Sequence, residues 1–149
     1  MALGAFAGLR CQEIAHLNVE DLLWADGLLR VSAYAAKGGR ERMIPLHHEI
    51  EGALKAYGVP RQGAMFMGQS RRRFRPERIS QLGSQYLHDA GIMATMHQLR
   101  HWFGTNVARS GNLRAAQELL GHASPATTAI YTKVTVDDMR SAVASLPKP

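Results

Sequence analysis

Apolar residues recur every three or four positions along most of the chain, which is the spacing that places them on one face of a helix. Glycine, proline or asparagine stands at many ends of these stretches, where it favours a helix boundary. The pattern predicts helical segments, with their caps, near residues 2–8, 10–17, 47–58, 76–91, 97–111, 112–121, 124–131 and 136–147. The chain is therefore expected to be mainly α-helical.

A different pattern occupies the stretch between the second and third helical segments. Residues 22–31 carry an Asp-Gly pair at 26–27 between two short apolar runs, which is typical of a β-hairpin. A second turn at 36–40 leads into residues 43–46, another short apolar run with a proline near its end. The predicted fold class is α+β, mainly α with one small three-stranded antiparallel sheet.

Length and composition limit the class of protein. The 149 residues, 46% hydrophobic and 20% charged, suit one globular domain. The formal net charge of +6 favours a polyanionic partner such as nucleic acid, although a merely basic protein is an equal alternative. The single cysteine excludes an internal disulfide and fits a reducing compartment, so we expect the cytoplasm. No apolar run approaches transmembrane length, and no membrane partner is expected.

Arg10 and Glu13 lie at the start of the second predicted helix. A helix N-terminus favours anions, and an arginine there adds a planar fork that binds two phosphate oxygens. Glu13 follows at i+3 and would orient Arg10 through an ion pair. The alternative is a surface pair that contributes little to stability.

Two histidines and an arginine stand close together at the start of the helix predicted from residue 97. His97 and Arg100 are at i and i+3, so they are expected to share a helix face. His97 and His101 are at i and i+4, which also permits a zinc site. The metalloprotease form of that motif has glutamate directly after the first histidine, and Gln98 stands there instead. Zinc is therefore disfavoured.

Five short motifs follow one another in a distinctive order. They are Gly-Leu-Arg-x-x-Glu at 8–13, Lys-Gly-Gly at 37–39 before a strand ending Ile-Pro-Leu, His-x-Leu-Arg-His at 97–101, Leu-Leu-Gly-His at 119–122 and Thr-Thr-x-x-Tyr at 127–131. Their order and spacing resemble the tyrosine recombinases, the phage-integrase family. The resemblance extends from about Leu3 to Leu146 and rests on the whole set of motifs, since each motif alone is weak.

The resemblance implies a site-specific recombinase that breaks and rejoins DNA through a 3′-phosphotyrosine. Tyr131 would be the nucleophile, and neither ATP nor a metal would be needed. Arg10 and Arg100 match the two arginines that clamp the scissile phosphate, and His122 matches the histidine that hydrogen-bonds it. Preorganised cations of this kind stabilise the charge that develops on an attacked phosphate.

The same resemblance assigns the proton transfers. His97 matches the general base that removes the phenolic proton of Tyr131, whose ordinary pKa is near ~10. Lys37 matches the general acid that protonates the leaving 5′ oxygen. Without the other motifs, Lys37 would be interpreted as a solvated turn lysine.

A cluster of arginines precedes the helix predicted from residue 76. Its members are Arg71, Arg72, Arg73, Arg75 and Arg78. Contact with the DNA backbone and a solvated basic loop are equally good interpretations of this cluster.

The resemblance also bears on organisation and partners. Family members usually carry an N-terminal all-helical domain that clamps the other face of the DNA, and this sequence begins only nine residues before Arg10. We expect residues 1–149 to be the catalytic domain alone, with its first helix truncated. The expected partners are double-stranded DNA and further copies of the chain, as a tetramer held through the last helix. The alternative for that helix is packing on its own domain.

Two other functions compete with recombination. A type IB topoisomerase shares the tyrosine chemistry, but that family usually has lysine where this sequence has His97. A non-catalytic DNA-binding module with the same fold would be expected to lack at least one of the six polar residues, and all six are present.

Overall fold

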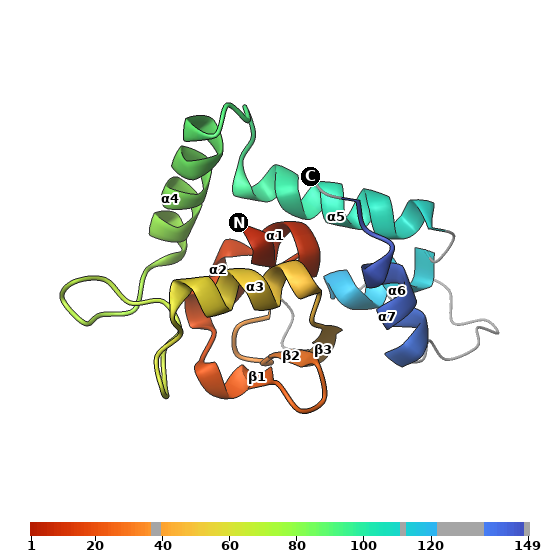
Figure 1. The fold of residues 1–149 in the computed structure, drawn as a ribbon, viewed down its shortest axis with the longest axis horizontal. Helices are drawn as coiled ribbons and strands as arrows, with labels where there is room; N and C mark the ends of the chain where they lie inside the picture. Colours follow the sequence, from red (N-terminus) through yellow and green to blue (C-terminus); the bar gives the residue numbers. More distant parts are fainter. Residues whose placement is uncertain (37–39, 111–112, 122–135, 148–149) are drawn as a thin grey trace.

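The computed structural model describes residues 1–36, 40–110, 113–121 and 136–147 (Figure 1). The helices are α1 (Ala2–Ala7), α2 (Cys11–His16), α3 (His48–Tyr57), α4 (Pro76–Asp89), α5 (Met96–Arg109), α6 (Leu113–Leu120) and α7 (Val136–Ala144). The strands are β1 (Leu22–Leu23), β2 (Leu28–Val31) and β3 (Arg42–Pro45), and a 3-10 turn, Val19–Asp21, precedes β1. The predicted fold class is confirmed, while the helix expected at 124–131 lies outside the described residues.

The sheet is antiparallel, with strand order β1-β2-β3. Gly27 has a φ of 63° in the turn between β1 and β2, which is why the Asp-Gly pair marks the hairpin correctly. Leu29 pairs with Leu22 on one side and Ile44 on the other, and Leu29 and Ile44 are fully buried. One face of this small sheet therefore belongs to the core.

The core lies between α1, α3, α5 and the sheet. In Figure 1, α4 stands at one end of the molecule and α6 with α7 at the other, and α1 lies between α5 and α3. Phe103 on α5, Ile50 on α3 and Leu119 on α6 are all fully buried and join these layers.

The turn between α1 and α2 depends on Gly8. Its φ of 61° lies in the left-handed region, and a Cβ there would come within 2.5 Å of Phe103 Cδ1. The turn leads into α2, where Glu13 Oε2 lies 3.7 Å from Nη1 of Arg100 on α5. Arg10 is consequently the N-cap residue of α2, where its backbone N–H donates to Glu13 Oε2 at 2.8 Å.

Helix α7 packs on its own chain. Ala142, Val143 and the following Leu146 are buried, and the helix contacts β3 and α6. This arrangement is the alternative considered above for the last helix. Within the described ranges, no helix has both the length and the apolar character that a membrane span requires.

Candidate active site

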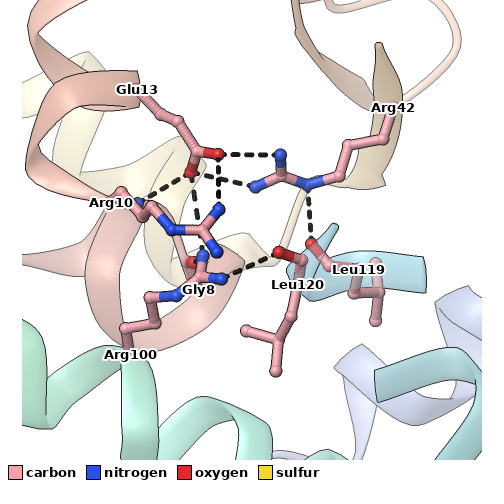
Figure 2. Close-up of polar contacts among 7 residues, drawn as sticks. All are labelled: Gly8, Arg10, Glu13, Arg42, Arg100, Leu119 and Leu120. Atoms are coloured by element: carbon pink, nitrogen blue, oxygen red, sulfur yellow. Dashed lines mark hydrogen bonds and ion pairs between the residues drawn. The ribbon is translucent and has the colours of Figure 1, made fainter. Parts of the chain in front are cut away.

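Three arginine side chains meet around the buried carboxylate of Glu13 (Figure 2). Arg10 and Glu13 come from the start of α2, Arg42 from the start of β3 and Arg100 from the middle of α5. We call these four residues the arginine cluster. Three guanidinium groups surround a single carboxylate, so the cluster carries excess positive charge.

Glu13 is the centre of the arginine cluster and its side chain is 0% exposed. It accepts from Arg10 N at 2.8 Å and Arg10 Nη1 at 3.2 Å. It also accepts from Arg42 Nη1 at 2.8 Å and Arg42 Nη2 at 2.9 Å. Burial alone would raise the pKa of Glu13, but the hydrogen bonds and charge of Arg42, with further help from Arg10 and Arg100, hold that pKa below its usual value. Glu13 is therefore ionised at neutral pH.

Arg100 is held mainly by backbone carbonyls. Its Nη1 donates to Gly8 O, and its Nη2 donates to Leu120 O at 2.8 Å. Glu13 Oε2 lies 3.7 Å from Arg100 Nη1, which is an ion pair without a hydrogen bond. Burial, followed by the charge of Arg10, lowers the pKa of Arg100 to about 10, so the group stays charged at neutral pH. Arg100 is a fixed cation joining α5, the Gly8 turn and the end of α6.

The sequence patterns above do not single out Arg42. Its side chain is only 8% exposed and its Nε donates to Leu119 O at 2.7 Å. A usable signal is present in the sequence, because Arg42 stands two residues before Ile44 on the same strand. Alternate residues of a strand point to the same face, so Arg42 shares the buried face with Ile44.

His97 does not contact the arginine cluster among the residues that the structure describes. It is exposed in the first turn of α5, and its Nε2 lies 2.8 Å from His101 Nε2, with the two rings edge to face. Although His97 and Arg100 are three residues apart, Arg100 is buried and His97 is exposed. The described residues include no group of three or more potential ligands from histidine, cysteine, aspartate and glutamate that could hold a metal ion.

The arginine-rich segment divides into two kinds of residue. Four of its arginines are exposed: Arg71, Arg72, Arg75 and Arg78, which we call the outer arginines. Arg73 is turned inward: its Nη1 donates to Ala15 O and Leu17 O, both at 3.0 Å, and its Nη2 donates to Asn18 Oδ1 at 2.6 Å. These bonds satisfy carbonyls at the C-terminal end of α2. Arg73 therefore ties the segment to the domain, an arrangement that neither interpretation of the basic cluster included.

Known proteins resemble this chain in both sequence and fold. A family model described as the phage integrase family matches residues 2–137. The chain belongs to the phage integrase family. The tyrosine recombinase XerA of Pyrococcus furiosus is 38% identical over 143 residues, which cover 91% of this chain and 49% of that protein.

Solved structures of integrase-family proteins agree. The integrase from mycobacterium phage Brujita is 36% identical, with a TM-score of 0.77, covering 96% of this chain and 48% of that one. The crystal structure of XerA recombinase is 31% identical, with a TM-score of 0.72, covering 94% of this chain and 54% of that one. The integrase-family chain spans about half the length of the curated relatives that it matches.

Three of the expected site residues of this integrase-family chain, Lys37, His122 and Tyr131, lie outside the described residues. Two of them lie near residues of the arginine cluster, or near a carbonyl that the cluster binds, in the sequence. Lys37 precedes Arg42 by five positions, and His122 comes two positions after Leu120, whose carbonyl Arg100 binds. Of the six expected catalytic residues, the structure thus brings Arg10 and Arg100 together, with Glu13 between them.

Proposed function

We propose that this chain is the catalytic domain of a site-specific tyrosine recombinase that acts on double-stranded DNA. The observation that carries the proposal is the pairing of Arg10 with Arg100 around the buried Glu13. Two fixed guanidinium groups suit the non-bridging oxygens of one phosphate, where negative charge develops during attack. The arginine side chains differ in access, since Arg10 is 28% exposed and Arg100 is 8% exposed.

The chemistry proposed is a pair of transesterifications. The oxygen of Tyr131 attacks the scissile phosphorus, the bond from phosphorus to the 5′ oxygen breaks, and Tyr131 stays joined to the 3′ phosphate. A 5′ hydroxyl from another strand then attacks the phosphotyrosine, reseals the backbone and releases Tyr131. One phosphodiester-like bond replaces another at each step, so the reaction needs no energy source, and we propose no cofactor.

Proton transfer is assigned to His97 and Lys37, and His122 donates to the phosphate. His97 stands one helical turn before Arg100 on α5, which places its backbone near the arginine cluster. Its role as base requires the imidazole to exchange its contact with His101 for the hydroxyl of Tyr131. A general base must reach hydrogen-bond distance of the proton that it removes.

We propose that the outer arginines of the basic segment, Arg71, Arg72, Arg75 and Arg78, bind the DNA backbone. Arg73 is left out because its guanidinium bonds Ala15, Leu17 and Asn18. Assembly as a tetramer on DNA is also proposed. The last helix packs on its own domain in the structure, so a route through that helix requires an exchange between copies. Because the proposed substrate is chromosomal or mobile DNA, we assign the chain to the cytoplasm.

A suicide duplex tests the proposal, and the DNA target sequence need not be known. The probe is a library of nicked duplexes with randomised sequence on both sides of the nick. A chain with active Tyr131 forms an adduct that survives denaturation, because the short fragment beyond the nick diffuses away and religation fails. Sequencing the trapped DNA then identifies the preferred site.

The control is Tyr131→Phe, which removes only the attacking oxygen. We expect an adduct from the wild type and none from this variant. Equal adducts from both proteins would remove Tyr131 from its role. DNA binding by the wild type without any adduct would favour the non-catalytic module, and relaxation of supercoiled plasmid without strand exchange would favour the topoisomerase.

A further inference from the structure

Arg42 links Glu13 of the arginine cluster to the end of α6, although none of the motifs that suggested the function includes it. Its guanidinium grips both carboxylate oxygens of Glu13 and also the carbonyl of Leu119. We propose that Arg42 is a positioning residue, which keeps Arg10 and Arg100 available to one phosphate and fixes the end of α6. This inference rests on the proposed function, because it concerns the same phosphate.

The hydrogen-bonding capacity of Glu13 limits which arginines it can hold. A carboxylate has about four acceptor positions on its two oxygens. Arg42 fills two of them, and the backbone and side chain of Arg10 fill the other two. Arg100 remains 3.7 Å from Glu13 Oε2 and turns its donors to the carbonyls of Gly8 and Leu120. The four acceptor positions of Glu13 are thus filled by Arg10 and Arg42, so Arg100 forms an ion pair with Glu13 but no hydrogen bond.

The end of α6 is held by two arginines. The last carbonyls of a helix lack partners within that helix and carry its negative dipole end. Arg42 binds Leu119 O and Arg100 binds the next carbonyl, Leu120 O, at 2.7 and 2.8 Å. Two side chains from β3 and α5 therefore grip the same helix end (Figure 2). The chain continues from there through Gly121 to His122.

Loss of Arg42 would disturb both of these arrangements. Two acceptor positions on Glu13 would open, and Leu119 O would lose a charged donor. Arg10 and Arg100, the cations that remain beside Glu13, would be drawn toward those empty positions and away from a phosphate. The pKa of Glu13 would rise, because Arg42 is the leading influence that lowers it against the effect of burial. Arg10 and Arg100 would therefore be displaced, and their positions would become sensitive to acid.

Arg42→Met tests the inference, because methionine keeps much of the apolar stem and removes the donors. Arg40→Met is the matched control, since Arg40 lies two residues away, is 75% exposed and pairs loosely with Glu118, with 3.9 Å between Arg40 Nη2 and Glu118 Oε2. A thermal unfolding curve first establishes the temperature at which each variant is folded. If Arg42→Met fails to fold, Arg42→Lys replaces it, because lysine keeps the charge but loses the two-pronged grip.

The first measurement uses inorganic phosphate and no DNA. Phosphate is titrated against protein labelled with nitrogen-15 in its arginine side chains, while carbon-13 labelling follows the Glu13 carboxyl with pH. We expect ~10-fold weaker phosphate binding at Arg10 and Arg100 in Arg42→Met, an intermediate loss in Arg42→Lys, and none in Arg40→Met. The Glu13 titration should move to higher pH in Arg42→Met alone. Wild-type binding by Arg42→Met, or an equal loss in the control, would overturn the inference.

The second measurement is the rate of adduct formation on the suicide duplex selected by the wild type. We expect Arg42→Met to slow the rate ~10–100-fold at saturating DNA, while DNA affinity changes less than ~3-fold. In the pH profile of this rate, the acid limb of Arg42→Met should move to higher pH, because the pKa of Glu13 rises. An unchanged rate would refute the positioning role. If the wild type forms no adduct, the proposed function fails, and the phosphate titration still decides on Arg42.

Discussion

The arginine cluster and the outer arginines of the basic segment use the same side chain in opposite ways. In the cluster, Arg42 and Arg100 are each 8% exposed, and every guanidinium has a carboxylate or carbonyl partner. In the segment, Arg71 and Arg72 are exposed to solvent. Buried, bonded cations hold a geometry, whereas exposed cations contribute a screened attraction to a polyanion. Burial, more than residue type, separates the positions expected to govern chemistry from those expected to govern affinity.

Arg100→Ala is the strongest test of the difference between buried and exposed arginines. This change removes the charged donor of Gly8 O and Leu120 O and one cation from beside Glu13. Breaking a buried ion pair costs about 3–5 kcal/mol in free energy of unfolding, and adduct formation should be lost. Urea unfolding measures the change in free energy of unfolding, and the suicide duplex measures adduct formation. A stability change below about 1 kcal/mol would show that the buried bonds carry little energy.

Within the basic segment, the same difference can be tested by comparing the inward-facing Arg73 with its exposed neighbour Arg72. Arg73→Ala should reduce the free energy of unfolding by about 1–3 kcal/mol, since Ala15 O, Leu17 O and Asn18 Oδ1 each lose a charged donor. Arg72→Ala, next to it, should stay within about 0.5 kcal/mol of the wild type. Urea unfolding of both variants provides the test. Equal effects would mean that the inward bonds of Arg73 are not maintained in solution.

Acid should weaken the arginine cluster through Glu13. The folded pKa of Glu13 lies below the ordinary 4.5, so its contribution to stability is fully present above the unfolded pKa. That contribution is lost as the pH falls through the lower, folded value. Unfolding curves from about pH 7 to about pH 3 should therefore decline more steeply for the wild type than for Glu13→Gln. Parallel declines would exclude Glu13 as a source of the acid sensitivity.

The smallest expected effect belongs to the outer arginines. Each lost phosphate contact should reduce the slope of log affinity against log salt by about 0.9. Arg71→Ala and Arg72→Ala should each show this reduction on duplex DNA, and Arg73→Ala should not. Binding isotherms at several salt concentrations measure the slope. An unchanged slope in Arg72→Ala would make the segment a solvated loop, the other interpretation of its sequence.

Local chemistry in the sequence is enough to predict most elements. The Asp-Gly pair requires a left-handed glycine, and Gly27 supplies it between β1 and β2. Pro76 begins α4, as its fixed φ favours, and Gly58 ends α3 with a φ of 73°. The contact between Arg10 and Glu13 also follows from their spacing on one helix.

Burial of charged residues is harder to predict, because distant parts of the chain decide it. His97 and Arg100 share a helix, yet Arg100 is buried because the carbonyls of Gly8 and Leu120 bind its guanidinium, whereas His97 is exposed. The sequence leaves Arg73 as either a DNA contact or part of a solvated loop, but its guanidinium binds the carbonyl of Ala15 at the end of α2. The alternation of Arg42 with Ile44 indicates a buried strand face, but it does not identify Glu13 and Leu119 as the partners of Arg42. In each case the deciding partner lies on another element of the fold.

The wide sequence separation of these partners has a consequence for how the protein is made. The bond from Arg100 to Gly8 spans 92 positions, and the bond from Arg42 to Leu119 spans 77. Contacts so distant form late, since closing long loops costs entropy that only the collapsed domain repays. A growing chain on the ribosome contains Arg10 and Glu13 early, but it still lacks Arg100 and the carbonyls of Leu119 and Leu120. If the proposed function holds, DNA cleavage would thus be withheld until synthesis has passed the end of α6.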